Sequence, residues 1–266
     1  MAKNTKLTKN EQKVIKVARK IAEVNNTTFK KAYIHMAMMF RAVHDMCMKR
    51  DEVICMQNSR QNNGLNITIN HQGKMMGMYS LSTSCRCNER CARNAQIKGS
   101  ICEHCFAMRQ TEMYKSMNEP LEQNYKILTS EIIDWEDLPI INALYFRIES
   151  FGDVANVTQC INYMHLIQKN PNTFFAWWSK NMDIIDKMFR ETGYEKPANV
   201  NFIQSSLMVD KAMCPKYWFV DKVFTVFDPA TIKERNININ CGARSCLKCH
   251  LCYEKNDVVY VNEKKK

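Results

Sequence analysis

Glycine and proline are scarce in this chain, with only 7 and 6 residues of each among 266. This scarcity argues against glycine-rich phosphate-binding loops and against sandwiches of many hairpins, which need turn residues at short intervals. The chain also contains no Walker loop, no nucleophile elbow and no H-E-x-x-H helix. It therefore lacks the signatures of P-loop nucleotide hydrolases, α/β-hydrolases and zinc metalloproteases.

Long apolar runs are missing too, since no stretch approaches the roughly 18 residues that suggest a membrane-spanning helix. The first residues, Met1-Ala-Lys-Asn4, lead into a lysine-rich segment without the apolar core of a secretory signal. We therefore expect a cytoplasmic protein that does not enter a membrane. The composition, 45% hydrophobic and 24% charged, is that of a globular protein with a sizeable core.

Cysteine, in contrast, is abundant, with 13 residues against 6 histidines. Disulfides suit small exported chains, so they fit this chain poorly. Four cysteines are isolated, and an isolated cysteine is most simply a small buried hydrophobe. One of them, Cys214, precedes a proline, as some ferredoxin ligands do, so it is an additional candidate metal ligand. The isolated residues are Cys47, Cys55, Cys160 and Cys214. The other nine fall in two short windows, which favours metal binding.

The second window places four thiols within 12 residues, as Cys241-x4-Cys246-x2-Cys249-x2-Cys252. Its parts match the C-x4-C-x2-C spacing of plant-type ferredoxins and the C-x2-C-x2-C run of bacterial ones. A cubane cluster needs one thiolate at each iron, and a C-x2-C turn can supply two adjacent corners. Zinc also takes four cysteines, usually from two knuckles separated by a longer loop. We predict a 4Fe-4S cluster here, with zinc as the alternative.

The first window joins a C-x3-C pair, Cys87 and Cys91, to a C-x2-C pair, Cys102 and Cys105. These four are the predicted ligands of another iron–sulfur site, again with zinc as the alternative, and Cys85 is an additional candidate. The window follows a predicted strand, and the carboxyl ends of strands carry the active sites of α/β proteins. Basic residues, which would offset the thiolate charge, stand among these cysteines: Arg86, Arg90, Arg93 and Lys98.

Residues 1–60 form a distinct basic segment, with 13 Lys or Arg and 5 Asp or Glu, a net charge of +8 out of the chain's +11. Helical periodicity follows a capping box at Thr8–Glu11. A stripe of lysines occupies one face of this predicted helix and could contact nucleic-acid phosphates, although a solvated face is the simpler interpretation. The stripe consists of Lys9, Lys13, Lys16 and Lys20.

From residue 61 to 266 the pattern changes to short apolar runs that alternate with helical stretches. Such alternation indicates βα units around a parallel sheet. We predict an α/β, partial TIM-barrel-like fold with helices outside and cysteine-rich loops that bind the clusters. Because the carboxyl ends of parallel strands share one edge, we expect both windows on one face. The predicted strands are 65–70, 75–82, 143–148, 173–178, 200–204 and 223–227, and the helices are 106–117, 121–129, 155–169 and 182–192.

A family resemblance rests on short segments within residues 65–255. They resemble the phage-encoded gene product 88 family, which is similar in layout to radical-SAM-type iron–sulfur barrels. The resemblance implies an iron–sulfur protein of a phage or another mobile element. The segments are Cys105-Phe106-Ala107, Tyr145–Ser150 with Gly152-Asp153, Phe174–Lys180, Asn199–Phe202 with Ser205-Ser206, and the closing cysteine-rich stretch.

The radical-SAM pattern, C-x3-C-x2-C, leaves one iron open for S-adenosylmethionine. Here Cys87-x3-Cys91 is followed by Asn94 where the third cysteine would stand. The C-x2-C pair begins only at Cys102, eleven residues after Cys91. If four cysteines saturate the cluster, no iron is open, so S-adenosylmethionine is the weaker of the cofactor expectations.

Three polar residues near the end of one predicted strand are candidate catalytic groups: Arg147, Glu149 and Asp153. The two carboxylates could act as an acid and a base, or they could be loop carboxylates that pair with Arg147 or cap a helix. We expect an iron–sulfur protein with two 4Fe-4S-type sites that acts as a redox or radical-type enzyme on an unknown substrate. The alternative is a nucleic-acid-associated protein whose iron–sulfur or zinc sites are structural.

Overall fold

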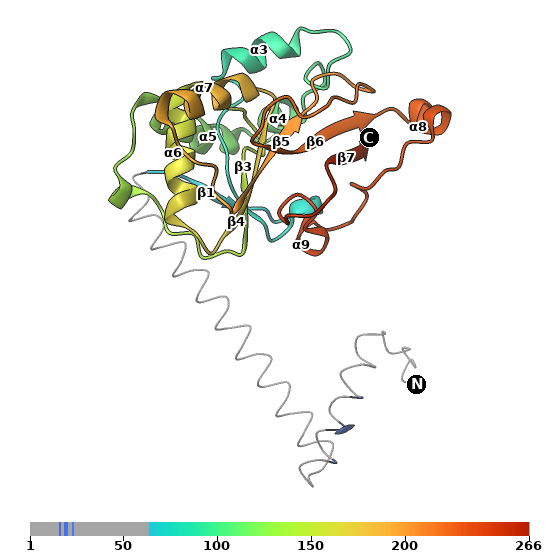
Figure 1. Cartoon of the computed structure of the whole chain (residues 1–266), viewed down its shortest axis with the longest axis horizontal. Helices are drawn as coiled ribbons and strands as arrows, with labels where there is room; N and C mark the ends of the chain where they lie inside the picture. Colours follow the sequence, from blue (N-terminus) through green and yellow to red (C-terminus); the bar gives the residue numbers. More distant parts are fainter. Residues whose placement is uncertain (1–15, 17–18, 21–22, 24–63, 266) are drawn as a thin grey trace, which may run out of the picture. The chain divides into compact units, whose positions relative to one another are not determined.

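The computed structural model describes residues 16, 19, 20, 23 and 64–265 (Figure 1). Contacts divide the chain into two units, Met1–Gln57 and Asn58–Lys266. In the first unit the described residues, Lys16, Arg19, Lys20 and Glu23, are helical and exposed. The predicted division at residues 60 and 61, and most of the helix expected after Thr8–Glu11, depend on residues outside the described part. They stay predictions.

The second unit is built on a seven-stranded sheet in the order β1-β2-β3-β4-β5-β6-β7. Strand β1 is antiparallel to β2, and every later pair is parallel. Strands β1 and β7 are the two edges, so the sheet is open. The strands are β1 (Ile67–Ile69), β2 (Tyr79–Leu81), β3 (Tyr145–Ile148), β4 (Phe174–Ser179), β5 (Val200–Ser205), β6 (Val220–Phe227) and β7 (Tyr260–Lys264).

Helices lie in most connections between the parallel strands, as in βα units, whereas the connection from β5 to β6 contains none. The three longest are α5 (Asn118–Ser130), α6 (Val157–Lys169) and α7 (Met182–Thr192). Shorter helices lie in the connections: α3 (Glu89–Ala95), α4 (Phe106–Met113), α8 (Pro229–Arg235) and α9 (Cys246–Cys249). Three 3-10 turns complete the set: η1 (Gly73–Met75), η2 (Lys115–Met117) and η3 (Trp135–Asp137).

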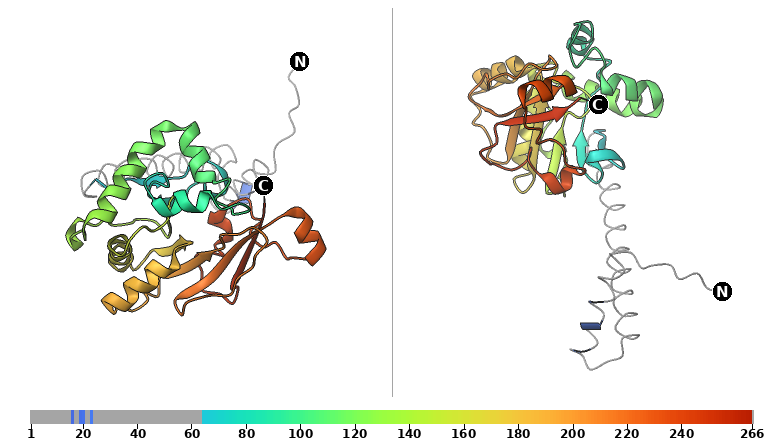
Figure 2. Two further views of the ribbon diagram at one scale, coloured as in Figure 1. Left: turned by 90° about the horizontal axis from the view of Figure 1, so that it is seen from above. Right: turned by 90° about the vertical axis from the view of Figure 1, so that its right-hand side faces the viewer.

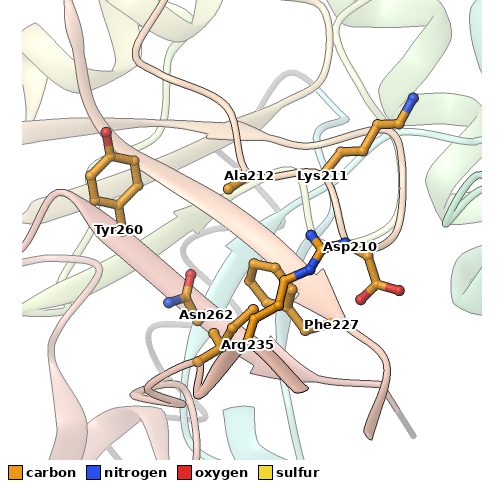
Figure 3. Close-up of a pocket in the computed structure, with 8 residues that line it drawn as sticks. Asp210, Lys211, Ala212, Phe227, Arg235, Tyr260 and Asn262 are labelled. Carbon is orange, nitrogen blue, oxygen red and sulfur yellow. The ribbon is translucent and has the colours of Figure 1, made fainter. Parts of the chain in front are cut away.

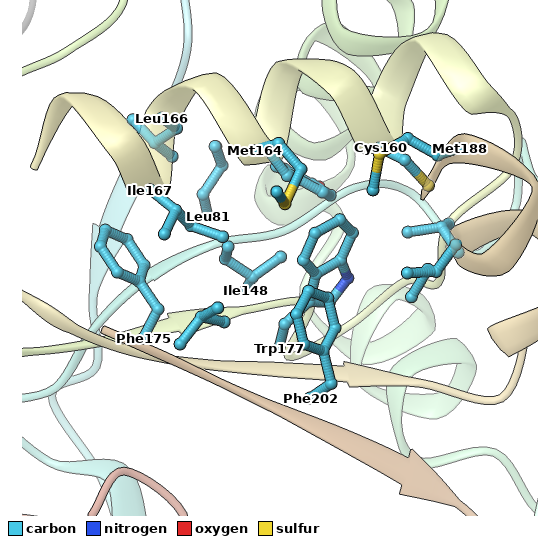
Figure 4. Close-up of a cluster of buried hydrophobic side chains, with 14 of the residues drawn as sticks. Leu81, Ile148, Cys160, Met164, Leu166, Ile167, Phe175, Trp177, Met188 and Phe202 are labelled. Carbon is cyan, nitrogen blue, oxygen red and sulfur yellow. The ribbon is translucent and has the colours of Figure 1, made fainter. Parts of the chain in front are cut away.

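One face of the sheet packs against α6 and α7 and forms the main core (Figure 4). Alternate residues of the central strands point there, among them Phe146, Phe175, Trp177 and Phe202, each without exposed surface. This alternation follows from the pleat, which sends successive side chains to opposite faces. Figure 2 shows the helices gathered on that side of the strands. We call it the helix face.

The opposite face, here called the inner face, is covered by the C-terminal segment instead of by long helices. A smaller buried cluster of Met78, Ala176, Ile203 and Tyr253 lies there, and Cys246 and Cys252 pack against it. Two buried side chains of the inner face hold the covering segment. Asn201 donates to the carbonyls of Cys252 and Glu254, and Lys222 donates to Asn256 and to the carbonyl of Val258.

The predicted α/β class with a mostly parallel sheet and helices is confirmed, whereas a closed barrel is not formed by the described strands. The long predicted helices and central strands agree with the structure within a few residues. The sequence patterns missed α3, α8, α9 and β7. None of the described helices is both long enough and apolar enough to cross a membrane.

Candidate metal centres

The first cysteine window lies at the carboxyl edge of the sheet. It begins four residues after β2 ends at Leu81, and Ser100 pairs with Met208, which follows β5. Asn88 fixes the start of α3, because its Oδ1 accepts from the backbone of Arg90 and Cys91. Its Nδ2 donates to the carbonyl of Asp153 at 2.7 Å. The loop after β3 thus positions the helix that carries Cys91.

Four thiols of this window are linked by electrostatic effects of one on the next, and we call them the first set: Cys85, Cys91, Cys102 and Cys105. Burial raises the pKa of the Cys85 thiol to about 11, and nearby Cys105 adds to the increase. Burial also raises the pKa of Cys91, with contributions from Asp153 and Cys85. Burial raises the pKa of Cys102 as well, and Cys105 contributes. Desolvated neutral thiols of this kind would bind metal with release of protons.

Cys87 is more exposed than the other three predicted ligands, and its place in a metal site stays a prediction. Its thiol is exposed, and it lines a cavity on the side of Tyr125 and Asn181. Burial raises the pKa of Tyr125, and both Cys87 and Cys91 contribute to the increase. Cys85, predicted only as an additional ligand, is buried beside Cys105 instead.

Lys180, at the end of β4, supplies positive charge to the first set. Its ammonium group lowers the pKa of both Cys91 and Cys102, although burial dominates at each thiol. Within the described residues the ammonium makes no ion pair or side-chain hydrogen bond. The backbone N–H of Lys180 donates to Asp153 at 3.0 Å, which fixes the position of the residue. Sequence spacing did not single out Lys180.

Glu149 and Asp153 are structural acceptors at the carboxyl edge. Buried Glu149 accepts hydrogen bonds from the backbone and hydroxyl of Thr83 at 3.1 and 2.7 Å, from Gln159 at 2.9 Å and from Tyr163 at 2.7 Å. It adopts a φ of 59°, a left-handed conformation that non-glycine residues rarely take. Burial raises its pKa, against the lowering effect of Tyr163 and Thr83.

Asp153 accepts from the Ser179 hydroxyl at 2.5 Å and from the backbone of Lys180. Both carboxylates therefore tie the loop after β3 to its neighbours. Neither carboxylate caps a helix in the described residues, and the choice between acid–base residues and structural carboxylates stays open. Neither pairs with Arg147 by its side chain.

The second window lies on the inner face, near the amino ends of the strands. Its four thiols, Cys241, Cys246, Cys249 and Cys252, are the second set; Cys246 and Cys249 contribute to the raised pKa of Cys241, Cys249 to that of Cys246, and the other three to that of Cys252. Burial raises the pKa of Cys252 to about 12. Figure 1 shows α3 of the first window and α9 of the second at opposite ends of the strands. The expectation that both windows gather on one face is therefore wrong, because the chain returns to the amino ends before Cys241.

Two cations from the strand region face the second set. Arg147 of β3 lowers the pKa of Cys246, Cys252 and Tyr253, although burial raises each of them more strongly. The Lys74 ammonium lies 3.8 Å from the Cys241 sulfur and 3.0 Å from the Cys241 carbonyl oxygen, and it also pairs with Glu263. Arg147 therefore lies beside the second set, whereas Glu149, two residues later, holds the loop after β3 at the carboxyl edge.

The neighbouring residues Trp177 and Trp178 both have a buried indole N–H without a partner in the described residues. Trp177 points to the helix face, and Trp178 to the inner face, where it packs in the same cluster as Cys246 and Cys252. A buried donor without an acceptor is costly. The sulfides of an iron–sulfur cluster accept hydrogen bonds. The unpaired N–H of Trp178 beside the second window therefore fits such a cluster.

Histidine adds an aromatic contact to this region. The His250 ring stacks on Tyr145, with centroids 4.4 Å apart, and its Nδ1 lies 3.3 Å from Glu254. The His250 ring is therefore engaged by Tyr145 and Glu254.

Other predicted residues lie elsewhere. Cys160 is buried in the main core, as predicted for an isolated cysteine. Cys214 is exposed and lies 4.0 Å from the Tyr260 hydroxyl, apart from both sets. Lys16 and Lys20 are exposed, whereas Lys9, Lys13, Cys47 and Cys55 lie outside the described residues. The nucleic-acid prediction stays a prediction.

A cavity of about 600 Å³ lies beside β7 (Figure 3), and its lining residue Asn262 accepts a hydrogen bond from the Cys241 backbone at 3.0 Å. Its lining combines apolar side chains with Lys211 and Arg235 at the rim, and none of the predicted site residues contributes. The lining residues are Asp210, Lys211, Ala212, Phe227, Arg235, Ile237, Tyr260 and Asn262.

In the described part of the chain, no group of three or more His, Cys, Asp or Glu side chains converges as the ligands of one metal ion would. Zinc holds its ligands around a single point, about 2.3 Å from each sulfur. A cubane instead binds each thiolate at a separate iron, so its four sulfurs stand farther apart.

Comparisons with known proteins leave the family resemblance as an expectation. The chain matched no protein-family model, no curated protein and no solved structure.

Proposed function

We propose that this chain is an iron–sulfur protein with two 4Fe-4S clusters at separate places on one sheet. The first set of cysteines would hold one cluster at the carboxyl edge, and the second set would hold the other on the inner face. Four cysteines for each cluster match the usual ligand number. The proposed first-site ligands are Cys85, Cys91, Cys102 and Cys105, with Cys87 left out.

The observation that carries the proposal is the surroundings of the second set. Thiols of this set lie near Arg147, Lys74 and the unpaired indole N–H of Trp178. A cluster with four thiolates carries net negative charge, so cations and N–H donors stabilise it and raise its reduction potential. A single zinc ion would offer no sulfide to the indole.

The strand order supports a partial-barrel architecture for the cluster-binding unit. Strands β2 to β7 follow one another without reversal, which is the winding direction of a TIM-type barrel, whereas doubly wound sheets reverse. In such barrels the carboxyl edge carries the chemistry. The first cluster lies at that edge, so we assign it to the reaction and the second cluster to electron transfer.

We infer a redox or radical-type enzyme whose substrate approaches the carboxyl edge. A bound cluster there would supply one electron at a time. Two residues of the protein assist the cluster. Lys180 places a positive charge beside Cys91 and Cys102, and the Asp153 carboxylate fixes Lys180 by accepting a hydrogen bond from its backbone N–H. With four cysteines in the first set, no iron is left for S-adenosylmethionine. A reduced-state spectrum that shifts when S-adenosylmethionine is added would argue for an open iron instead.

The ligand assignment is tested by two double variants, each of which removes half of one set. Cys246→Ser/Cys252→Ser should lose the second cluster, and Cys91→Ser/Cys105→Ser the first. Each anaerobically purified variant should retain about half of the wild-type iron and acid-labile sulfide. Cys160→Ser is the matched control for a buried cysteine outside both sets and should retain all of it. Equal iron in all four proteins would refute the assignment.

A further inference from the structure

A second cavity, of about 250 Å³, opens beside the first cysteine set, and we call it the Asn181 pocket. It lies where α3, the loop after β3 and the start of α7 come together, at the carboxyl edge of the sheet (Figure 1). Ligands of α/β proteins bind at this edge. Its lining is mostly polar: Cys87, Asn88, Glu89, Arg90, Arg93, Tyr125, Ala155, Asn181 and Ile184.

The lining contains a buried acceptor without a partner. Asn181 is only 3% exposed, and its Nδ2 donates to the Val154 carbonyl at 3.0 Å. Its Oδ1 accepts no hydrogen bond in the described residues. Because nearly all buried polar atoms of native proteins are paired, such an atom needs an explanation. A donor group on a bound molecule would satisfy it.

The same lining contains a buried donor without a partner. The Nε of Arg90 makes no hydrogen bond in the described residues, and one terminal nitrogen reaches only the Lys180 carbonyl, at 3.4 Å. Arg90 also has no carboxylate within ion-pair distance in that part of the chain. Arg93 differs, because it pairs with Glu89 at 3.8 Å. The pocket therefore offers a guanidinium that forms no ion pair in the described residues, although it contributes to the lowered pKa of the more distant Asp183, and such a group suits a carboxylate.

We propose that the Asn181 pocket binds a small carboxylate that carries an α-amino or α-hydroxyl group. The carboxylate would accept from Arg90, and the neighbouring N–H or O–H would donate to Asn181 Oδ1. The cavity is smaller than the roughly 300–1,000 Å³ of pockets for drug-sized ligands. It therefore suits a molecule of amino-acid size.

The binding claim rests on the pocket alone, and only the role of the ligand as the enzyme's substrate rests on the proposed function. Iron content is therefore measured on every sample used for binding. Binding by a sample without iron would support this inference while refuting the proposed function. An iron-loaded sample that binds none of the probes would refute this inference while supporting the proposed function.

The test is a calorimetric titration of the full-length, anaerobically purified protein with L-alanine, L-lactate and propionate. Propionate has the carboxylate but lacks the α-donor, so it probes Asn181 without any change to the protein. At least one of the first two should bind, about fivefold more tightly than propionate. The tighter of the two shows whether the α-group is an amine or a hydroxyl. Equal affinity for all three, or no binding up to about 10 mM, would overturn the inference.

A protein-side test uses Arg90→Gln, with Arg109→Gln as the matched control. Arg109 is an exposed arginine of α4 that lies outside the pocket lining. Arg90→Gln should weaken binding of the preferred acid by about tenfold or more, because a charge-assisted hydrogen bond is lost. Arg109→Gln should leave it unchanged. Unchanged affinity in Arg90→Gln would contradict the proposal.

Discussion

The guanidinium carbon of Arg147 lies 4.3 Å from the centre of the Trp178 ring. The two side chains come from adjacent strands and share the inner face, where Cys246 and Cys252 also pack. Stacking on the indole holds the arginine in place by a cation–π contact. One charge and one N–H donor are thereby held beside the second cysteine set, and each leads to a prediction.

Replacing Arg147 by Gln should make the reduction potential of the second cluster more negative. Loss of a neighbouring positive charge destabilises the more negative, reduced state, and we expect a shift on the order of 50 mV. A spectroscopic redox titration measures it. Arg190→Gln, which removes an exposed arginine of α7 paired with Asp186, should leave the potential unchanged. Equal shifts in the two variants would contradict a specific role for Arg147.

Trp178→Phe should also lower this potential, because the indole N–H is lost while most of the packing is kept. One hydrogen bond of about 1 kcal/mol corresponds to a shift on the order of 40 mV for one electron. Trp177→Phe is a close control, since Trp177 has the same unpaired N–H but faces the helices. If both variants shift the potential equally, the cluster does not lie on the inner face.

Cys85→Ser and Cys87→Ser should behave differently, although the two residues are separated by one position. Cys85 is buried beside Cys105, whereas Cys87 is exposed and faces Tyr125. We expect Cys85→Ser to lose the first cluster, about half of the iron, and Cys87→Ser to keep it. Iron and sulfide analysis distinguishes them. Loss of iron in Cys87→Ser alone would restore the C-x3-C assignment.

The cysteine windows and most βα units were predictable because they depend on local patterns. Strands such as Phe174–Ser179 and helices such as Met182–Thr192 carry continuous apolar runs or helical periodicity, and tertiary contacts did not override them. The edge strand Tyr260–Lys264 was missed because its composition is polar and charged. Four thiols within 12 residues likewise indicate metal in any fold.

The arrangement around the cysteines was not predictable, because it depends on long-range contacts. Lys74 meets Cys241 across 167 positions, and no local pattern links them. The burial of Cys85 and the exposure of Cys87 depend on packing that the spacing does not show. The position of the second window on the inner face depends on Asn201, whose amide holds the Cys252 carbonyl.

Glu149→Gln should destabilise the fold by about 1–3 kcal/mol, because the amide cannot accept from all four donors that meet the carboxylate. Burial raises the pKa of Glu149, from an ordinary value of 4.5. The folded state then binds its proton more tightly than the unfolded state does. This residue therefore lowers the stability as the pH rises from about 4.5 through its folded-state pKa.

The pH dependence is checked by thermal unfolding at several pH values. Glu149→Gln should show a smaller loss of stability across that range than the wild type. Glu122→Gln, an exposed position on α5, should retain the wild-type slope. Identical slopes for all three proteins would mean that Glu149 titrates no differently in the folded and unfolded states.

The central claim is that the two cysteine sets hold iron–sulfur clusters. The most direct test is Mössbauer spectroscopy of anaerobically purified, iron-57-labelled protein, together with its acid-labile sulfide content. We predict about eight irons and eight sulfides for each chain, in spectra typical of 4Fe-4S clusters. A colourless protein with stoichiometric zinc and no sulfide would contradict the account.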